Sequence, residues 1–277
     1  MALKDWIEDI FRVKKPVIGM VHLRPLPGSP FYETGSMEGI IDRAVSEARL
    51  LQDGGVDGLQ VENMWDHPYL KGDEIGHETT SSLAVCSHAV REAVDIPVGI
   101  NCHLNGSKQA LAAAIASGAR WIRVFELVNT YISNAGIVEA SGPSALRYRH
   151  AIGADHVRLL CDVLVKHGSH FITSDRDIRE QAHDVETFKG DAVIVTGGAT
   201  GERPEPEDVR TVREAVSIPL FLGSGITIDN IDQYLPIMDG AIVGSQFKEE
   251  GKWQNPVSLE RTKAFMEKIR SFRKAFQ

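Results

Sequence analysis

Eight short apolar segments recur along the chain, and stretches of helical periodicity lie between them. The segments are nearly continuous in apolar character, which is typical of parallel strands that helices cover. Eight strand–helix units in one chain favour a closed (β/α)8 TIM barrel over an open, doubly wound sheet. The predicted strands lie near residues 16–22, 58–63, 97–102, 121–126, 157–165, 192–196, 219–223 and 240–244.

The segments between the strands carry apolar side chains on one face. In residues 38–53, Ile40, Ala44, Ala48 and Leu51 recur at helical spacing. We predict a single α/β domain over residues 1–277, because a barrel of this kind takes about 250 residues. No Gly-x-Gly-x-x-Gly follows the first strand, so a dinucleotide-binding open sheet is the weaker alternative. Further helices are predicted over residues 107–117, 178–188, 205–216, 228–235 and 257–274.

The first 15 residues are expected to form a short helix. Trp6, Ile7, Ile10 and Phe11 fall near helical spacing, so we predict an amphipathic helix within residues 1–15 that plugs or flanks one end of the barrel. The alternative is a peripheral membrane anchor. No segment has the apolar length of a membrane span, and the early charges are unlike a secretion signal. The expected location is cytoplasmic.

The net charge and the cysteine content limit which classes of partner and site are expected. A formal net charge of −8 argues against nucleic acid, which requires a basic face. Cys86, Cys102 and Cys161 are far apart without a Cys-x-x-Cys, which argues against a disulfide framework or a zinc knuckle. A small phosphorylated or ribosyl ligand remains compatible, since it needs only a few amides or cations. We expect that ligand, and copies of the same chain in a homo-oligomer, as partners.

Glycine-rich turns follow the last predicted strands. Gly223, Ser224 and Gly225 come after the seventh, and Gly244 and Ser245 after the eighth. Barrels often hold phosphate in these two loops, because glycine lets backbone N–H groups approach an anion. The alternative is that the glycines only make tight turns. A third turn, after the sixth strand, adds the candidate ligand-binding residues Thr196, Gly197, Thr200 and Gly201.

Polar residues crowd the predicted C-terminal ends of six strands. Active sites of (β/α)8 barrels lie at that rim, so this convergence favours an enzyme over a scaffold. The predicted catalytic residues are His22, Glu62, His103, Glu126, Asp162 and Lys166, with Asn63 and Asn101 as ligand-binding residues.

The charged candidates each have a structural alternative. Buried acids need partners or shifted pKa values, so Glu62 and Asp162 could act as general bases or could pair with Arg123 or Lys166. Lys166 could form a Schiff base, neutralise a phosphate or pair with Asp162.

The histidines suggest proton transfer or metal binding. His22, His103 and His167 could join Glu62 in a divalent metal site. No compact His-x-His or His-Glu-x-x-His motif supports this, so no metal and no cofactor are predicted.

Motifs of a known family are spread along nearly the whole chain. They lie at residues 16–30, 61–69, 162–167, 196–201, 223–227 and 239–253. Together they resemble the BtpA/SgcQ family. The resemblance implies a phosphate-binding (β/α)8 barrel and no assigned catalytic residues. One branch of the family is associated with photosystem I biogenesis, and another, found with sugar-uptake genes, is described as a candidate nucleosidase.

Three functions follow from these observations. The first is an enzyme acting on a phosphorylated sugar or a ribosyl, nucleoside-like compound, with Glu62 or Asp162 as base or charge stabiliser and His103 or Lys166 as acid. The second is a non-catalytic assembly or stability factor, as in photosystem I biogenesis. The third is a phosphosugar isomerase, epimerase or aldolase with Lys166 as the reactive amine.

Overall fold

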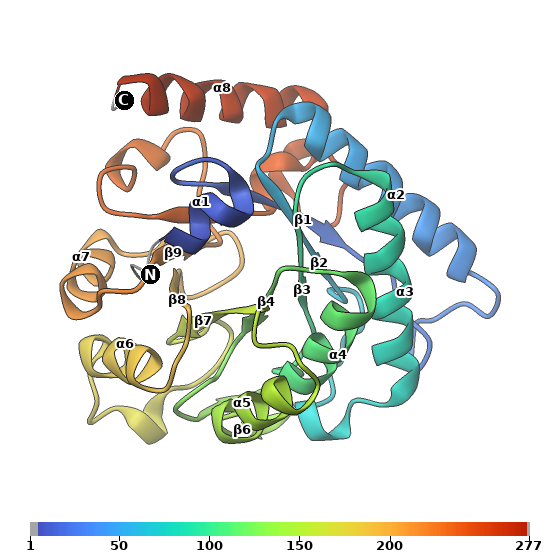
Figure 1. Ribbon diagram of the computed structural model, residues 1–277, viewed down its shortest axis with the longest axis horizontal. Helices are drawn as coiled ribbons and strands as arrows, with labels where there is room; N and C mark the ends of the chain where they lie inside the picture. The colour runs from blue at the N-terminus through green and yellow to red at the C-terminus, as the bar shows by residue number, and fades with distance from the viewer. Residues whose placement is uncertain (1–4, 276–277) are drawn as a thin grey trace.

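The computed structural model describes residues 5–275, and eight parallel strands in it close into a barrel in the order β1-β10-β9-β8-β7-β4-β3-β2 (Figure 1). This confirms the predicted TIM barrel. All eight predicted strands are present, and most are one or two residues shorter than the apolar runs suggested. The strands are β1 Val17–His22, β2 Gly58–Glu62, β3 Val98–Asn101, β4 Trp121–Val124, β7 Arg158–Val163, β8 Ala192–Thr196, β9 Leu220–Gly223 and β10 Gly240–Val243.

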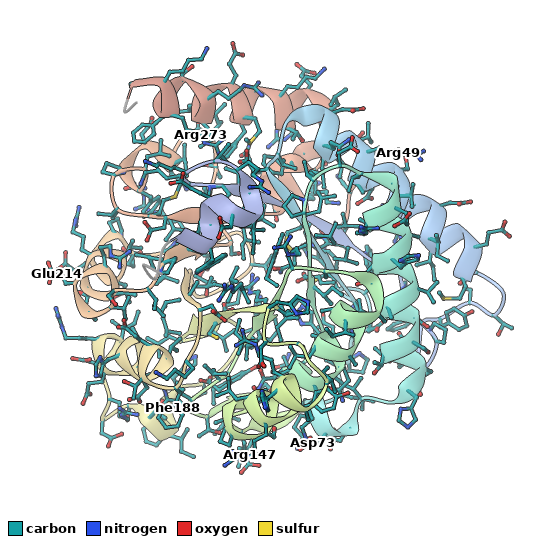
Figure 2. The ribbon with its side chains drawn as sticks, viewed as in Figure 1. Arg49, Asp73, Arg147, Phe188, Glu214 and Arg273 are labelled. Carbon is teal, nitrogen blue, oxygen red and sulfur yellow. The ribbon has the colours of Figure 1, made fainter. Side chains whose placement is uncertain are left out.

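Helices surround the barrel and turn their charged faces outward. Arg49, Arg147 and Glu214 illustrate this, since all three are exposed at the periphery (Figure 2). The apolar faces pack on the strands and form the main core. The outer helices are α2 Met37–Gly54, α3 His77–Ala93, α4 Ser107–Ser117, α5 Gly142–Ala151, α6 Ile178–Thr187, α7 Pro206–Ala215 and α8 Leu259–Ala275.

The helix predicted over residues 228–235 is wrong. That segment holds only a single 3₁₀ turn, η3 Ile231–Gln233. The Asn230 side chain accepts a hydrogen bond from the Thr227 N–H (2.9 Å) and donates one to the Gly225 carbonyl (2.8 Å). Such side-chain bonds to nearby backbone compete with helical ones, and Pro236 follows.

A hairpin interrupts the alternation between β4 and α5. Its strands, β5 Tyr131–Ser133 and β6 Gly136–Val138, are antiparallel and too short to stand out as an apolar pattern. Ile132 also pairs with Ser169 in the loop after β7. Phe125, Tyr131, Val138 and Val165 form a small apolar cluster beneath it. The hairpin is thus fixed to the C-terminal rim.

Helix α1, Asp5–Phe11, closes the opposite end of the barrel. It lies across the opening that faces the viewer in Figure 1. Trp6 stacks on Phe221, with ring centroids 6.3 Å apart, and Phe11 contacts Trp121 at 5.0 Å. The apolar face of α1 is therefore used inside the barrel, as the plug interpretation predicted. No helix within residues 5–275 is long and apolar enough to cross a membrane.

Replacing Trp6 by alanine should destabilise the fold by about 3–5 kcal/mol, because the substitution leaves a cavity against the barrel interior. Trp6 is 6% exposed and packs in the same cluster as Ile18, Leu160 and Ile194. The measurement is urea unfolding, with Glu8→Ala on the exposed face of α1 as the control. Equal stability of the two variants would show that α1 is not part of the cooperative fold.

Candidate functional site

A cavity of about 630 Å³ opens at the C-terminal ends of the strands. This volume is in the usual range for small-molecule sites. The cavity has two chemically different halves, one over β1–β4 and one over the loops that follow β7–β10. Ten of the residues predicted from the sequence line it: His22, Glu62, His103, Lys166, Thr200, Gly201, Ser224, Gly225, Gly244 and Ser245.

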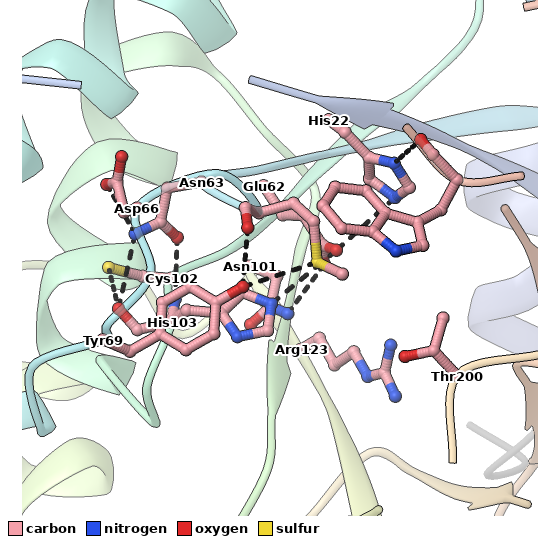
Figure 3. Close-up of polar contacts among 12 residues, drawn as sticks. His22, Glu62, Asn63, Asp66, Tyr69, Asn101, Cys102, His103, Arg123 and Thr200 are labelled. Carbon is pink, nitrogen blue, oxygen red and sulfur yellow. Dashed lines mark hydrogen bonds and ion pairs between the residues drawn. The ribbon is translucent and has the colours of Figure 1, made fainter. Parts of the chain in front are cut away.

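One layer of polar side chains forms the floor of the first half. The strand register pairs His22 with Glu62, Glu62 with Asn101, and Asn101 with Arg123. Paired residues of parallel neighbours point to the same face, so these four side chains from β1, β2, β3 and β4 enter the barrel at one level. Figure 3 shows them gathered around Glu62.

Glu62 is the buried acid at the centre of this layer. The Nδ2 of Asn101 donates to its Oε2 (2.9 Å), and the Nε2 atoms of His22 and His103 lie 3.6 Å and 3.7 Å from Oε1. Burial alone would raise the pKa of Glu62, but His103, His22 and Arg123 outweigh burial and hold that pKa below its usual range. Burial, with help from Lys248, lowers the pKa of His22 to about 4. At neutral pH Glu62 is therefore ionised and His22 is neutral.

The ring of His103 lies between two aromatic side chains. Its ring stacks on Tyr69 (centroids 4.5 Å apart) and meets Phe125 edge-on (4.8 Å). Its backbone N–H donates to Oδ1 of Asn63 (2.7 Å), which explains why Asn63 supports the site without lining the cavity. Both ring nitrogens are buried and make no hydrogen bond within residues 5–275, although Nε2 keeps its 3.7 Å contact with Oε1 of Glu62. Such atoms are costly unless a ligand engages them.

The second half of the cavity is cationic and rich in backbone N–H groups. Lys166 donates from Nζ to the Ser224 hydroxyl (3.0 Å), and the Gly201 N–H donates to the same oxygen (3.2 Å). Thr200 is fixed by His167, whose Nε2 accepts from the Thr200 N–H (3.1 Å). Burial, with repulsion from Arg123, lowers the pKa of Lys166 to about 8. Lys166 thus sits on the candidate phosphate loop and not on Asp162.

Gly225 is required by close packing as well as by its backbone conformation. Its φ is 63°, in the region that favours glycine, and a Cβ there would lie 2.0 Å from the Glu202 carbonyl oxygen. A Cβ built on Gly197 would lie 2.2 Å from the same carbonyl oxygen. The N–H groups of Gly225 and Ser245 make no hydrogen bond to any part of the chain that the structure describes. Both residues line the cavity, so these two N–H groups are candidate donors to an anion.

The remaining predicted residues lie outside the cavity. Asp162 forms a bidentate ion pair with Arg123, and both hydrogen bonds are 2.7 Å long. The Asn101 side chain donates its hydrogen bond to Glu62. Glu126 is buried, and its Oε1 accepts a 3.3 Å hydrogen bond from the Asn129 N–H. The others that do not line the cavity are Asn63, Thr196, Gly197 and Gly223.

We expect Glu126 to affect the stability of the fold and not catalysis. Burial, reinforced by Asp162, raises the pKa of Glu126 to about 8. Its proton therefore stabilises the fold fully below the usual pKa of 4.5, and this stabilisation is lost as pH rises through about 8. We expect Glu126→Gln to gain on the order of 3 kcal/mol relative to wild type between pH 5 and 8.5. Urea unfolding at both pH values checks this, with exposed Glu207→Gln as control; a pH-independent difference would contradict it.

Several cavity residues were not predicted as site residues. Arg123 and Phe125 lie within or just after a strand, where sequence does not reveal which face a side chain takes. Tyr69, Tyr131 and Trp253 enter from loops and the hairpin. Tyr69 and Trp253 do fall inside the family motifs, and this was the one feature of the sequence that could have identified them as site residues. Within residues 5–275, no group of three or more His, Cys, Asp or Glu side chains is arranged to hold a metal ion.

Solved structures resemble the chain in fold. The chain matches (S)-3-O-geranylgeranylglyceryl phosphate synthase from Thermoplasma acidophilum with a TM-score of 0.59 and 14% identity, over 96% of this chain and 98% of that one. It matches thiamine phosphate pyrophosphorylase from Pyrococcus furiosus with a TM-score of 0.58 and 14% identity, over 93% and 96%. At this identity the likeness shows the fold alone.

Relatives found by sequence share a higher identity with the chain than these solved structures do. An uncharacterized protein of Pyrococcus furiosus is 38% identical over 257 residues, which cover 93% of this chain and 95% of the relative. The photosystem I biogenesis protein BtpA of Synechocystis is 36% identical over 258 residues, 93% of this chain and 88% of the relative. The model of the BtpA family matches residues 13–271. The chain therefore belongs to the BtpA family.

Proposed function

We propose that this protein is an enzyme acting on a small phosphorylated sugar or a ribosyl, nucleoside-like phosphate. The observation that carries the proposal is the division of one cavity into a half lined by Lys166 and glycine-rich loops and a half centred on an ionised, buried acid. The phosphoryl group would bind over the loops after β7–β10, and the reacting bond would lie over Glu62 and His103.

The phosphate end rests on three kinds of donor. Lys166 supplies a positive charge, Ser224 a hydroxyl, and Gly225 and Ser245 supply backbone N–H groups that have no hydrogen-bond partner within residues 5–275. A phosphoryl group presents several acceptor oxygens to such a set. The solved neighbours named above, a glycerol phosphate-bound synthase and a thiamine phosphate pyrophosphorylase, handle phosphorylated compounds in barrels of this kind.

The reacting end suits cleavage of a glycosidic bond. An ionised Glu62 would stabilise positive charge developing on the sugar carbon as the bond to the leaving group breaks, and would accept a proton from the attacking water. His103 would donate a proton to the leaving group through a ring nitrogen, neither of which makes a hydrogen bond within residues 5–275. The rings of Tyr69, Phe125 and Tyr131 give the leaving group an aromatic wall.

Phosphate binding should depend on the charge of Lys166. We expect Lys166→Met to weaken inorganic phosphate binding about 10- to 100-fold at pH 7, because a charged hydrogen bond is lost. In wild type the affinity should fall as pH rises through about 8, where Lys166 loses its proton, and the variant should lack this fall. Calorimetry checks both effects, with Lys108→Met on α4 as the control. Wild-type protein that binds neither phosphate nor phosphosugars would refute the proposed function.

A second candidate rests on the same lysine. An amine with a pKa near 8 is partly unprotonated and therefore nucleophilic at neutral pH, as a Schiff-base isomerase or aldolase requires. The Ser224 contact directs Nζ to the phosphate loop instead, which favours the first candidate. Borohydride treatment in the presence of phosphosugar aldehydes and ketones decides between them: a covalent adduct on Lys166 supports the second candidate, and none supports the first.

A non-catalytic role is the third candidate, and its support is the 36% identical photosystem I biogenesis protein. The test is complementation of a strain that lacks its own copy of the relative. Rescue by a Glu62→Gln variant would favour assembly over catalysis, since that substitution removes the central charge and keeps the shape.

A further inference from the structure

Arg123 enters the cavity from β4, and two of its three guanidinium nitrogens are already committed. Nε and Nη2 donate to the two carboxylate oxygens of Asp162 at 2.7 Å each. The guanidinium also lies 5.2 Å from the Phe125 ring centroid. Arg123 is 6% exposed, so these contacts fix the side chain in one position.

The third nitrogen, Nη1, makes no hydrogen bond within residues 5–275. Nη1 is not one of the buried side-chain atoms of that region that lack a hydrogen-bond partner, so it is accessible to solvent. Arg123 also lines the cavity. Nη1 is therefore the donor that Arg123 presents to a ligand. In Figure 3 the guanidinium extends from the Glu62 side toward the side of Thr200.

The position of Arg123 is intermediate between the two halves. Its register places it in the layer of Glu62 and Asn101. Its Nη2 also lies 3.4 Å from where a Cβ on Gly223 would be, directly before the Ser224–Gly225 loop. A ligand that spans the two halves must pass over this guanidinium.

We infer that Arg123 is a substrate-binding residue whose Nη1 donates to a hydroxyl oxygen of the sugar, between the phosphoryl group and the reacting bond. Asp162 already balances the charge of Arg123, so the free donor suits an uncharged oxygen better than a second anion. Glu62, an acceptor in the same layer, complements it for hydroxyl groups. The inference rests on the proposed function, because it assigns a contact within that ligand.

The test compares two probes, inorganic phosphate and ribose 5-phosphate, by calorimetry. Arg123→Lys keeps a charge for Asp162 but cannot pair with it and also present Nη1. We expect its affinity for ribose 5-phosphate to fall about 10-fold or more and its affinity for phosphate to change less than about 2-fold. Arg158→Lys, at a strand arginine paired with Asp191 away from the cavity, should change neither affinity.

An equal fall for both probes, or no fall for either, would overturn the role of Arg123 while leaving the proposed function standing. Wild-type protein that binds neither probe would overturn both. Thermal unfolding verifies that Arg123→Lys is folded. If it is not, the double substitution Arg123→Gln with Asp162→Asn removes both buried charges together, and the same selective loss of ribose 5-phosphate binding is expected.

Discussion

A Gly225→Val substitution is expected to weaken phosphate binding by about 100-fold or more. The new side chain would collide with the Glu202 carbonyl oxygen, which lies 2.0 Å from the Cβ position, and would force φ out of 63°. Segment 202–203 and the Ser224 loop would have to separate, so the N–H of Gly225 and the hydroxyl of Ser224 would leave the cavity together. Calorimetric titration with inorganic phosphate measures the loss.

The control for this prediction is Gly153→Val. Gly153 also has a positive φ, 70°, but no atom lies within 4 Å of its Cβ position, and it does not line the cavity. It therefore reproduces the backbone strain without the displaced loop. Phosphate affinity that falls equally in both variants would mean that general destabilisation, not the loop geometry, caused the loss.

The second large effect is on turnover. Glu62→Gln keeps the side-chain shape but removes the charge that Asn101, His22 and His103 surround. We expect turnover to fall about 10²- to 10⁴-fold, as is typical when a general acid–base group is lost. Phosphate affinity should stay within about 2-fold of wild type, because Glu62 lies in the other half of the cavity.

The assay follows release of ribose 5-phosphate from a panel of N-ribosyl 5-phosphates and nucleotides. Glu126→Gln is the matched control, since Glu126 is equally buried on the adjoining side of the barrel but does not line the cavity. Full turnover in the Glu62→Gln variant would remove Glu62 from the reaction. Full turnover in the Glu126→Gln variant separates a site effect from the loss of any buried acid.

The barrel and its glycine loops could be predicted because their signals are local. Apolar runs mark the strands, and Gly225 and Gly244 follow strands whose rank in the barrel fixes their position at the rim. The prediction of a helix over residues 228–235 was wrong because the Asn230 side chain forms hydrogen bonds with the backbone of its own turn. Apolar periodicity does not report such a contact.

The site itself was predictable only in part. Glu62 at the end of β2 and Lys166 in the loop after β7 were predicted, because the C-terminal rim collects such residues, and both line the cavity. Arg123 was identified only as a partner for acids, since its role depends on the register of β3 with β4 and on the length of its side chain. Tyr131 comes from a hairpin of three-residue strands, and Trp253 from the loop after β10. Contacts between such distant segments are set by tertiary packing, which a pattern of single residues does not encode.

We propose that one cavity holds a phosphoryl group over the β7–β10 loops and a sugar over Glu62. A crystal structure of the protein with ribose 5-phosphate tests this most directly. We expect phosphoryl oxygens within hydrogen-bonding distance of the Gly225 N–H and Lys166 Nζ, with the sugar over Arg123 and Glu62. A phosphoryl group beside Glu62, or a ligand bound outside this cavity, would contradict this arrangement.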